Sequence, residues 1–260
     1  MNKIEEVFAA KKRVFIPFVT AGDPSLATTE KLIYAMEKAG AGIIEIGIPF
    51  SDPVAEGPVI QEADNRALSK GCKIDDVFAM LRKVRAKTQI PLVFLTYINP
   101  IVVYGMDKFL KQAQEVKIAG IIVPDVPYEE KGMLVEPFAK YGIALISMIA
   151  PTSQDRIQMI AKEAKGYVYL VSSLGVTGVR SNITTDIGAM VAQGRAVTKT
   201  PVAVGFGIAT PEQAQKMATL SDGAIVGSAI VKIIAKYGEA AVEPVSKYVA
   251  EMVKAVEAAK

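Results

Sequence analysis

Eight short apolar runs constrain the fold of this chain more than any other feature. Each run is rich in β-branched residues and is apolar almost throughout, a pattern typical of parallel strands buried on both faces. The runs span residues 14–20, 42–48, 91–97, 120–125, 144–150, 167–173, 201–207 and 223–229. They predict eight strands of one parallel sheet.

Amphipathic segments that read as helices lie between many of these runs, and several begin at Ser, Thr, Asp or Pro. They span residues 28–40, 76–87, 106–116, 153–164 and 211–220. Eight strands alternating with helices in a chain of about 250 residues indicate an α/β fold, a (β/α)8 TIM barrel. No linker or shift in composition divides the chain, so we expect one domain over residues 1–260. Residues 2–10 and a closing helix at 238–260 read as additional N-terminal and C-terminal helices packed on the barrel.

The chain has no histidine, which restricts the chemistry it can perform. Ser-His-Asp and Cys-His catalysis and histidine-ligated metals are excluded, so proton transfer falls to Asp, Glu, Lys, Tyr or Cys. A single cysteine excludes an intrachain disulfide, in keeping with a reducing compartment. No apolar run approaches the length of about 18 to 20 residues that spans a bilayer, and no signal peptide is evident, so we expect a cytoplasmic location and no membrane association. A net charge of +3 makes no case for nucleic-acid binding.

Glu45 is the first candidate catalytic residue, because the active site of such a barrel lies where the strands end. Side chains alternate along residues 42–48, so isoleucines at 44, 46 and 48 would pack on helices while Glu45 points into the barrel. Gly47, on the same face, is expected to leave room for a ligand. A partly desolvated Glu45 would have a raised pKa suited to proton exchange. The competing interpretation is a buried structural Glu paired with a basic group, but the nearest strand-end loops carry no lysine or arginine.

Glu56 is the second candidate, in a loop that Pro49, Pro53 and Pro58 stiffen. Its apolar flanks favour a side chain held over a pocket, although a glutamate in a loop is usually solvated. Asp52 competes for a catalytic role. Its position between Ser51 and Pro53 is more typical of a turn-forming residue.

Glycine-rich turns end the last three runs, with the sequences GVTG (175–178), GFG (205–207) and VGSA (226–229). Turns of this kind expose backbone N–H groups beside helix N-termini, which is how this fold commonly binds a phosphate dianion. The hydroxyl of Ser228 could add a donor. The three turns together predict a phosphate site.

Several motifs resemble one known family in order and spacing across nearly the whole chain. They are PFVTAGDP, EIGIPFSDPVAEGPVIQEA, VPDVPYEE, YVYLVSSLGVTG, GFGIATPEQ and GSAIVKII, and they resemble the tryptophan synthase α subunit. The resemblance implies a lyase that cleaves indole-3-glycerol phosphate to indole and glyceraldehyde 3-phosphate. It also implies an αββα complex with a pyridoxal-phosphate-containing β subunit that receives the indole. It implies no cofactor or metal in this chain.

The resemblance also assigns roles to particular residues. The family's two catalytic acids match Glu45 and Glu56. Its substrate-contacting residues match Phe18, Tyr169 and Thr177, and its phosphate-binding residues match Gly178, Gly207, Gly227 and Ser228. The family usually has Asp where this chain has Glu56, which moves the carboxylate by about 1.5 Å, and we expect the loop to compensate.

Other functions are weighed against this interpretation. A Schiff-base aldolase would need a lysine pointing into the barrel, and none of the eight runs contains one. A free-standing lyase without a β partner and a weakly catalytic subunit that mainly activates β both remain open. The apolar run from Ile101 to Tyr104 is expected to contact a β subunit, with a fold-back over the indole pocket or the start of a buried helix as the alternatives.

Overall fold

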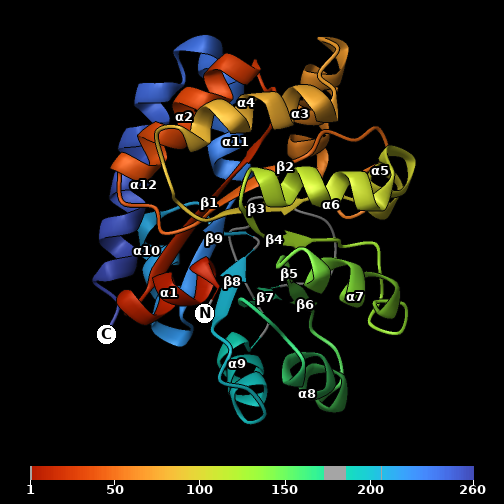
Figure 1. The fold of residues 1–260 in the computed structure, drawn as a ribbon. Coiled ribbons are helices and arrows are strands. Elements are labelled where there is room, and N and C mark those ends of the chain that lie inside the picture. The colour runs from red at the N-terminus through yellow and green to blue at the C-terminus, as the bar shows by residue number, and fades with distance from the viewer. Residues whose placement is uncertain (1, 173–185, 206) are drawn as a thin grey trace.

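The eight apolar runs form one parallel sheet that curves into a barrel in the computed structural model, which describes residues 2–172, 186–205 and 207–260 (Figure 1). The sheet order is β5-β4-β3-β2-β1-β9-β8-β7-β6, and each pairing is parallel. The strands are β1 (Val14–Thr20), β2 (Ile44–Gly47), β3 (Leu92–Leu95), β4 (Ile118–Ile122), β5 (Ala144–Leu145), β6 (Ser147–Ile149), β7 (Val168–Val171), β8 (Val202–Gly205) and β9 (Gly223–Val226).

The predicted fifth strand is divided in two. β5 pairs with β4, β6 pairs with β7, and only Ile146 separates them in the chain. The N–H of Ile146 still donates to the carbonyl of Ile121 at 3.0 Å. This single stretch therefore joins both edges of the sheet and nearly closes the barrel, which confirms the predicted fold class.

Helices surround the sheet, and all five predicted helices are present as α2, α4, α6, α8 and α10. Local sequence explains several starts: Ser25 caps α2 through its side chain, and Thr210 forms a capping box with Gln213 before the proline that begins α10. The described helices are α1 (Lys3–Ala10), α2 (Leu26–Lys38), α3 (Pro58–Ser69), α4 (Ile74–Arg85), α5 (Ile98–Tyr104), α6 (Met106–Glu115), α7 (Gly132–Lys140), α8 (Gln154–Lys162), α9 (Ile187–Arg195), α10 (Pro211–Leu220), α11 (Ser228–Tyr237), the 3-10 turn η1 (Gly238–Ala240) and α12 (Val242–Glu257).

Two hydrophobic layers hold the barrel together. Outside it, Ile44, Ile46 and Ile48 pack in one cluster with side chains of the surrounding helices. Inside it, residues such as Ile43 form a second cluster, which α1 joins through the fully buried Ile4. This second cluster includes Val14, at the start of β1, so α1 covers the amino-terminal end of the strands and leaves the carboxyl ends for a site.

Within the described ranges, the structure contains no helix that is both long enough and apolar enough to traverse a bilayer.

Candidate active site

Glu45 lies within β2 and points into the barrel, as the alternation of side chains predicts. Only 1% of the residue is exposed, and the hydroxyl of Tyr167 donates a hydrogen bond to its Oε1 at 2.5 Å. Burial raises the pKa of Glu45 to about 8, although the Tyr167 hydrogen bond acts in the opposite direction and the charge of Glu56 adds to the rise. Glu45 is therefore mainly a neutral acid at neutral pH, and it is poised to exchange a proton.

Phe18 lies beside Glu45, because these two residues are register partners on β1 and β2. Its ring fills the space next to Gly47, where a Cβ atom would lie 2.6 Å from the Phe18 Cζ. A Cβ on Gly227 would lie 3.2 Å from the same ring. The expectation that Gly47 leaves room for a ligand is therefore wrong, since this glycine instead makes room for Phe18.

The loop from β2 to α3 holds Glu56 inside the molecule, with only 4% of the residue exposed. The N–H of Glu56 donates to the carbonyl of Pro53 at 2.9 Å, and Gln61 Nε2 donates to the carbonyl of Glu56 at 2.8 Å. One residue earlier, the N–H of Ala55 donates to the Tyr97 hydroxyl at 3.1 Å. These bonds fix the backbone on both sides of the carboxylate, as the stiff, apolar loop predicts.

Asp52 lies on the outside of the same loop and is exposed. Its carboxylate accepts a hydrogen bond from the Ser51 hydroxyl at 2.5 Å, and its carbonyl accepts the N–H of Val54 at 2.9 Å. Its carbonyl therefore takes part in a turn, and Asp52 does not line the cavity that Glu45 and Glu56 share.

One cavity at the carboxyl end of the barrel brings together most of the predicted site residues. Both acids line it, and its other walls are largely apolar, which suits a ring-shaped ligand. Thr177 and Gly178 lie outside the described residues. The residues that line the cavity are Phe18, Glu45, Ala55, Glu56, Ile60, Leu95, Pro124, Met148, Tyr169, Gly207, Ile225, Gly227 and Ser228.

The glycine-rich turns after β8 and β9 have distinct structural roles. A Cβ on Gly205 would lie 2.5 Å from the Tyr169 hydroxyl, so this glycine makes room for the Tyr169 ring. Gly207 lines the cavity and has a φ of +75°, a conformation that favours glycine. Ser228 is the first residue of α11, so the N-terminal N–H groups of this helix and the positive end of its dipole lie at the cavity. This end of the cavity is suited to an anion.

Three polar residues of the site are not found by the sequence reasoning above: Tyr97, Tyr167 and Asp64. The position of Tyr167 two residues before Tyr169 in one strand run is a signal that both face inward. Asp64 falls on the buried face of α3 with Ile60, Ala63 and Ala67, and only 4% of it is exposed. A carboxylate at a helix position otherwise occupied by apolar residues is a signal that sequence reasoning could have used.

The described residues contain no group of three or more acidic, cysteine or histidine side chains placed to hold a metal ion.

These features define an enzyme-like (β/α)8 barrel with a carboxyl-lined cavity at its catalytic end. A sequence profile described as "Tryptophan synthase alpha chain" matches residues 4–260. The tryptophan synthase alpha chain of Lacticaseibacillus casei is 47% identical over 260 residues, covering 100% of this chain and 97% of that protein. That of Thermoanaerobacter sp. is 50% identical over 240 residues, covering 91% of this chain and 92% of that protein.

Solved structures agree with these sequence matches. The tryptophan synthase subunit alpha from Legionella pneumophila superimposes with a TM-score of 0.89 at 38% identity, covering 98% of both chains. A chain in the structure of Mycobacterium tuberculosis tryptophan synthase gives a TM-score of 0.89 at 28% identity, also covering 98% of both. The chain belongs to the tryptophan synthase alpha chain family, whose members are carbon–carbon lyases that cleave indole-3-glycerol phosphate.

Proposed function

We propose that the cavity binds indole-3-glycerol phosphate and that Glu45 and Glu56 carry out its cleavage to indole and glyceraldehyde 3-phosphate. The observation that carries the proposal is the buried Glu45, a neutral acid at neutral pH that lines the same cavity as Glu56. A second cavity shares Pro124 and Met148 with the first, but its described lining residues include no acid.

The reaction is a retro-aldol cleavage, and Glu45 can serve both of its proton transfers. As an acid, Glu45 gives its proton to C3 of the indole, which places positive charge on the indole nitrogen. As a carboxylate, it then takes the proton of the hydroxyl on the adjacent glycerol carbon. The C–O bond becomes a carbonyl, the C–C bond breaks, and its electron pair returns to the indole ring. Glu45 ends protonated, as it began.

Glu56 stabilises the charge that develops between these two proton transfers. Its carboxylate would accept the indole N–H and oppose the positive charge on the nitrogen, in a cavity that excludes much of the solvent. This interaction is stronger in the transition state than in the ground state, so it accelerates the reaction rather than only improving binding.

The remaining predicted residues divide between the two ends of the substrate. Phe18 and Tyr169 supply ring surfaces beside the acids, and the N-terminus of α11 with Gly207, Gly227 and Ser228 would hold the phosphate. Resemblance to the family predicts Thr177 and Gly178 as further substrate-binding and phosphate-binding residues, and both lie outside the described residues.

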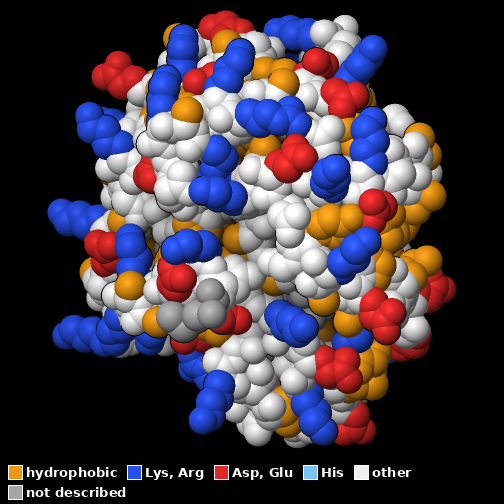
Figure 2. All heavy atoms as spheres, in the orientation of Figure 1, with side chains coloured by type: hydrophobic (Ala, Val, Ile, Leu, Met, Phe, Trp, Pro, Cys, Tyr) orange, Lys and Arg blue, Asp and Glu red, His pale blue; other side chains and the backbone are white. Residues whose placement is uncertain are grey.

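A β subunit is the partner we propose, in an αββα complex in the cytoplasm. The supporting observation is an exposed group of valines near the active-site mouth: Val54 is 72% exposed, Val102 55% and Val103 79%. Figure 2 shows hydrophobic side chains on the edge of the molecule where Figure 1 places α5. An isolated barrel gains little from such exposure.

The predicted apolar run from Ile101 to Tyr104 does not face outward as a whole, because it lies within helix α5. Ile101 is fully buried, and Tyr104 is half-buried, with its ring centroid 6.1 Å from that of Phe78. Val102 and Val103 alone remain for a partner surface. The alternative, that these residues start a buried helix, therefore holds for Ile101 and in part for Tyr104, but not for Val102 and Val103.

Indole release by the isolated chain, measured with and without a tryptophan synthase β subunit, tests the proposal. The wild-type chain should release indole from indole-3-glycerol phosphate, and β should increase the rate. Glu45→Gln should lose more than about tenfold in kcat, a barrier increase above about 1.4 kcal/mol, because an amide cannot exchange protons near neutral pH. Retention of activity in this variant would refute the proton-transfer role. Full activity without stimulation would favour a free-standing lyase, and stimulation of β without lyase activity would favour an activating subunit.

A further inference from the structure

A second cavity lies directly beside the active-site cavity, and the proposed reaction does not use it. It is formed by residues of the segments 123–134 and 145–160, and we call it the side cavity. Its volume is about 190 Å³. In another protein, an apolar cavity of about 150 Å³ binds benzene. The side cavity therefore has room for a group of the size of a benzene ring.

The side cavity lies where the wall of the barrel is interrupted. In the described sheet, β4 pairs with β5, whereas β6 pairs with β7 and forms the edge of the strand order. Met148 of β6 packs with the hydrophobic cluster inside the barrel, while Leu134 of α7 and Ile160 of α8 pack with the cluster outside it. All three line the side cavity. This cavity therefore reaches from the inside of the barrel toward α7 and α8.

Met148 is the flexible part of the partition between the two cavities. Only Met148 and Pro124 appear among the described lining residues of both. The ring of Pro124 restricts its backbone and leaves the side chain little freedom. Met148, in contrast, has three rotatable bonds in an unbranched side chain that adapts to irregular space. A shorter side chain at position 148 would therefore join the two cavities.

The side cavity suits an uncharged, apolar group better than an anion. Its described lining residues include two cations, Lys131 and Arg156, and both are already paired. Lys131 Nζ lies 2.5 Å from Oε2 of Glu163. Arg156 donates to both carboxylate oxygens of Glu129, at 2.6 and 3.1 Å. Most of the other lining residues are apolar, so an aromatic ring would find complementary walls.

The strand order places the side cavity at the end of the active site remote from the proposed phosphate site. That site lies at the N-terminus of α11, directly after β9. In the sheet order, β3, β2 and β1 lie between β4 and β9 on one side, and β5 to β8 lie between them on the other. β4 and β9 therefore face each other across the barrel. A substrate with its phosphate at Ser228 would direct its indole ring toward Pro124 and Met148.

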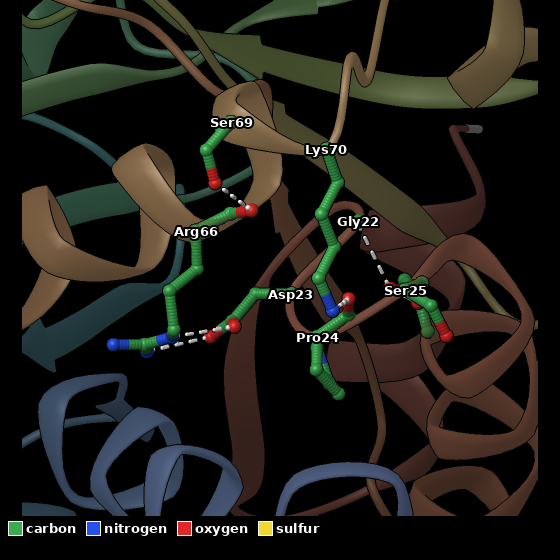
Figure 3. A network of polar contacts seen from close by, with 8 residues as sticks. Gly22, Asp23, Pro24, Ser25, Arg66, Ser69 and Lys70 are labelled. Atoms are coloured by element: carbon green, nitrogen blue, oxygen red, sulfur yellow. Dashed lines mark hydrogen bonds and ion pairs between the residues drawn. The ribbon is translucent and has the colours of Figure 1, made fainter.

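Side-chain bonds hold the wall of the active-site cavity near β1 and α3. Arg66 of α3 donates to both carboxylate oxygens of the buried Asp23, at 2.8 and 2.9 Å, and Lys70 Nζ donates to the carbonyl of Pro24 at 2.7 Å (Figure 3). These contacts tie α3, which contributes Ile60 to the active-site cavity, to the loop after β1. Additional space for a larger substrate is therefore available toward β4 and β6.

These observations lead to one inference, which rests on the proposed function. We propose that the side cavity extends the indole-binding end of the active site, and that Met148 is a specificity-determining residue that excludes bulky substituents on the benzo ring of the indole. With a shorter residue at position 148, the side cavity would accept an apolar ring substituent. Differences in apolar fit of this kind change specificity by about tenfold to two-hundredfold.

The test measures kcat/KM with a β subunit for indole-3-glycerol phosphate and for analogues that carry a phenyl group on different carbons of the benzo ring. One variant is Met148→Ala. A second combines it with Ile160→Phe, which fills the side cavity from α8, since Ile160 is not among the described residues that line the active-site cavity. Met159→Ala is the matched control, because Met159 is a 38% exposed methionine of α8 that is absent from the described lining of either cavity.

The expected result for Met148→Ala is a gain of about tenfold or more in kcat/KM for at least one phenyl analogue relative to the unsubstituted substrate. The wild type and Met159→Ala should both discriminate against that analogue, and Ile160→Phe should remove the gain. If the wild type cleaves the analogue as well as the unsubstituted substrate, or if Met148→Ala shows no gain, the inference is overturned. A gain that survives Ile160→Phe also overturns it, because the space then comes from the deleted side chain alone.

A second variant keeps the test decisive if thermal unfolding shows that Met148→Ala does not fold. Met148→Val also shortens the side chain, and its β-branched residue suits a strand. The same gain, and its loss on addition of Ile160→Phe, are expected. A folded Met148→Val variant with wild-type specificity would refute the role of Met148.

A binding measurement separates failure of this inference from failure of the proposed function. If the wild-type chain releases no indole even with β, the proposed function fails. Calorimetric titration with the corresponding phenylindoles then still tests the side cavity, because Met148→Ala should bind at least one of them about tenfold more tightly than the wild type and Ile160→Phe should reverse this. An active wild type with unchanged specificity in Met148→Ala contradicts only the role of Met148.

Discussion

The hydroxyl of Tyr167 donates a 2.5 Å hydrogen bond to Oε1 of Glu45 from across the barrel. Tyr167 directly precedes β7 and Glu45 lies on β2. In the sheet order, β1, β9 and β8 lie between these two strands. The ring of Tyr167 is fully buried, and Phe8 of α1 lies near it, with ring centroids 6.1 Å apart. The N-terminal helix thus helps to place a side-chain donor on the proposed catalytic acid.

Tyr167→Phe should change the pH dependence of the lyase reaction. The hydrogen bond favours the carboxylate form of Glu45 and so lowers its pKa against the larger effect of burial. Without it, the pKa of Glu45 should rise further above about 8. Activity that requires protonated Glu45 should then persist to higher pH. The measurement is kcat against pH with a β subunit. Tyr34→Phe is the control, because the Tyr34 hydroxyl donates its hydrogen bond to Glu30 rather than to Glu45. If the decrease of kcat at high pH is unchanged in Tyr167→Phe, that decrease does not report the titration of Glu45.

Glu45→Gln should alter how stability depends on pH. The pKa of Glu45 is raised from 4.5 to about 8 in the folded chain. Between these values the folded state holds a proton that the unfolded state has lost, so the stability of the wild type falls as pH rises through this window. The amide does not titrate. Asp64, another buried acid, is present in both proteins and so does not contribute to the difference between them. The variant should therefore gain stability relative to the wild type, on the order of 4 kcal/mol between about pH 4 and about pH 9.

Denaturant unfolding of both proteins at several pH values measures this difference. A pH-independent difference in the free energy of unfolding would mean that Glu45 titrates normally in the folded chain.

Glu56→Asp and Glu56→Ala test whether this loop is built for the longer acid. The bonds at Ala55, Glu56 and Gln61 fix the backbone around a glutamate. Shortening the side chain should withdraw the carboxylate by about 1.5 Å, so Glu56→Asp should lower kcat by about threefold to tenfold, and Glu56→Ala by about a hundredfold. Steady-state kinetics with indole-3-glycerol phosphate decide this. A faster Glu56→Asp variant would show that the loop does not compensate for the longer side chain of Glu56.

Most of the fold prediction rested on the pattern of apolar residues in the sequence. Strands buried on both faces leave continuous apolar runs in the sequence, and helices buried on one face leave a period of about 3.6 residues. The inward direction of Glu45 follows from the alternation of side chains along its strand. The division of the fifth strand at Ile146 could not be found this way, since ALISMI reads as one continuous run in which only Ser147 is polar.

The site was less accessible to sequence reasoning because its contacts join distant segments. Tyr167 and Glu45 meet only when the barrel closes, and no local pattern links them. The wrong expectation for Gly47 has the same origin: an absent side chain signals close approach, but the sequence does not say whether a ligand or Phe18 approaches. Asp64 differs, because its position on a buried helix face was visible in the sequence.

Ser228→Ala and Gly207→Val should weaken phosphate binding while leaving the two acids in place. Ser228 begins α11 at the cavity, and its hydroxyl and the helix N–H groups would bind the dianion, so its loss should cost about 1 kcal/mol, or about fivefold in affinity. A side chain at Gly207 should cost more, because it would block the backbone and oppose the φ of +75°. Calorimetric titration with glycerol phosphate measures both, and thermal unfolding of each variant separates lost binding from lost structure. Ala229, the next residue of α11, provides the control Ala229→Ser. If both cavity variants bind glycerol phosphate with wild-type affinity, the phosphate does not occupy this end of the cavity.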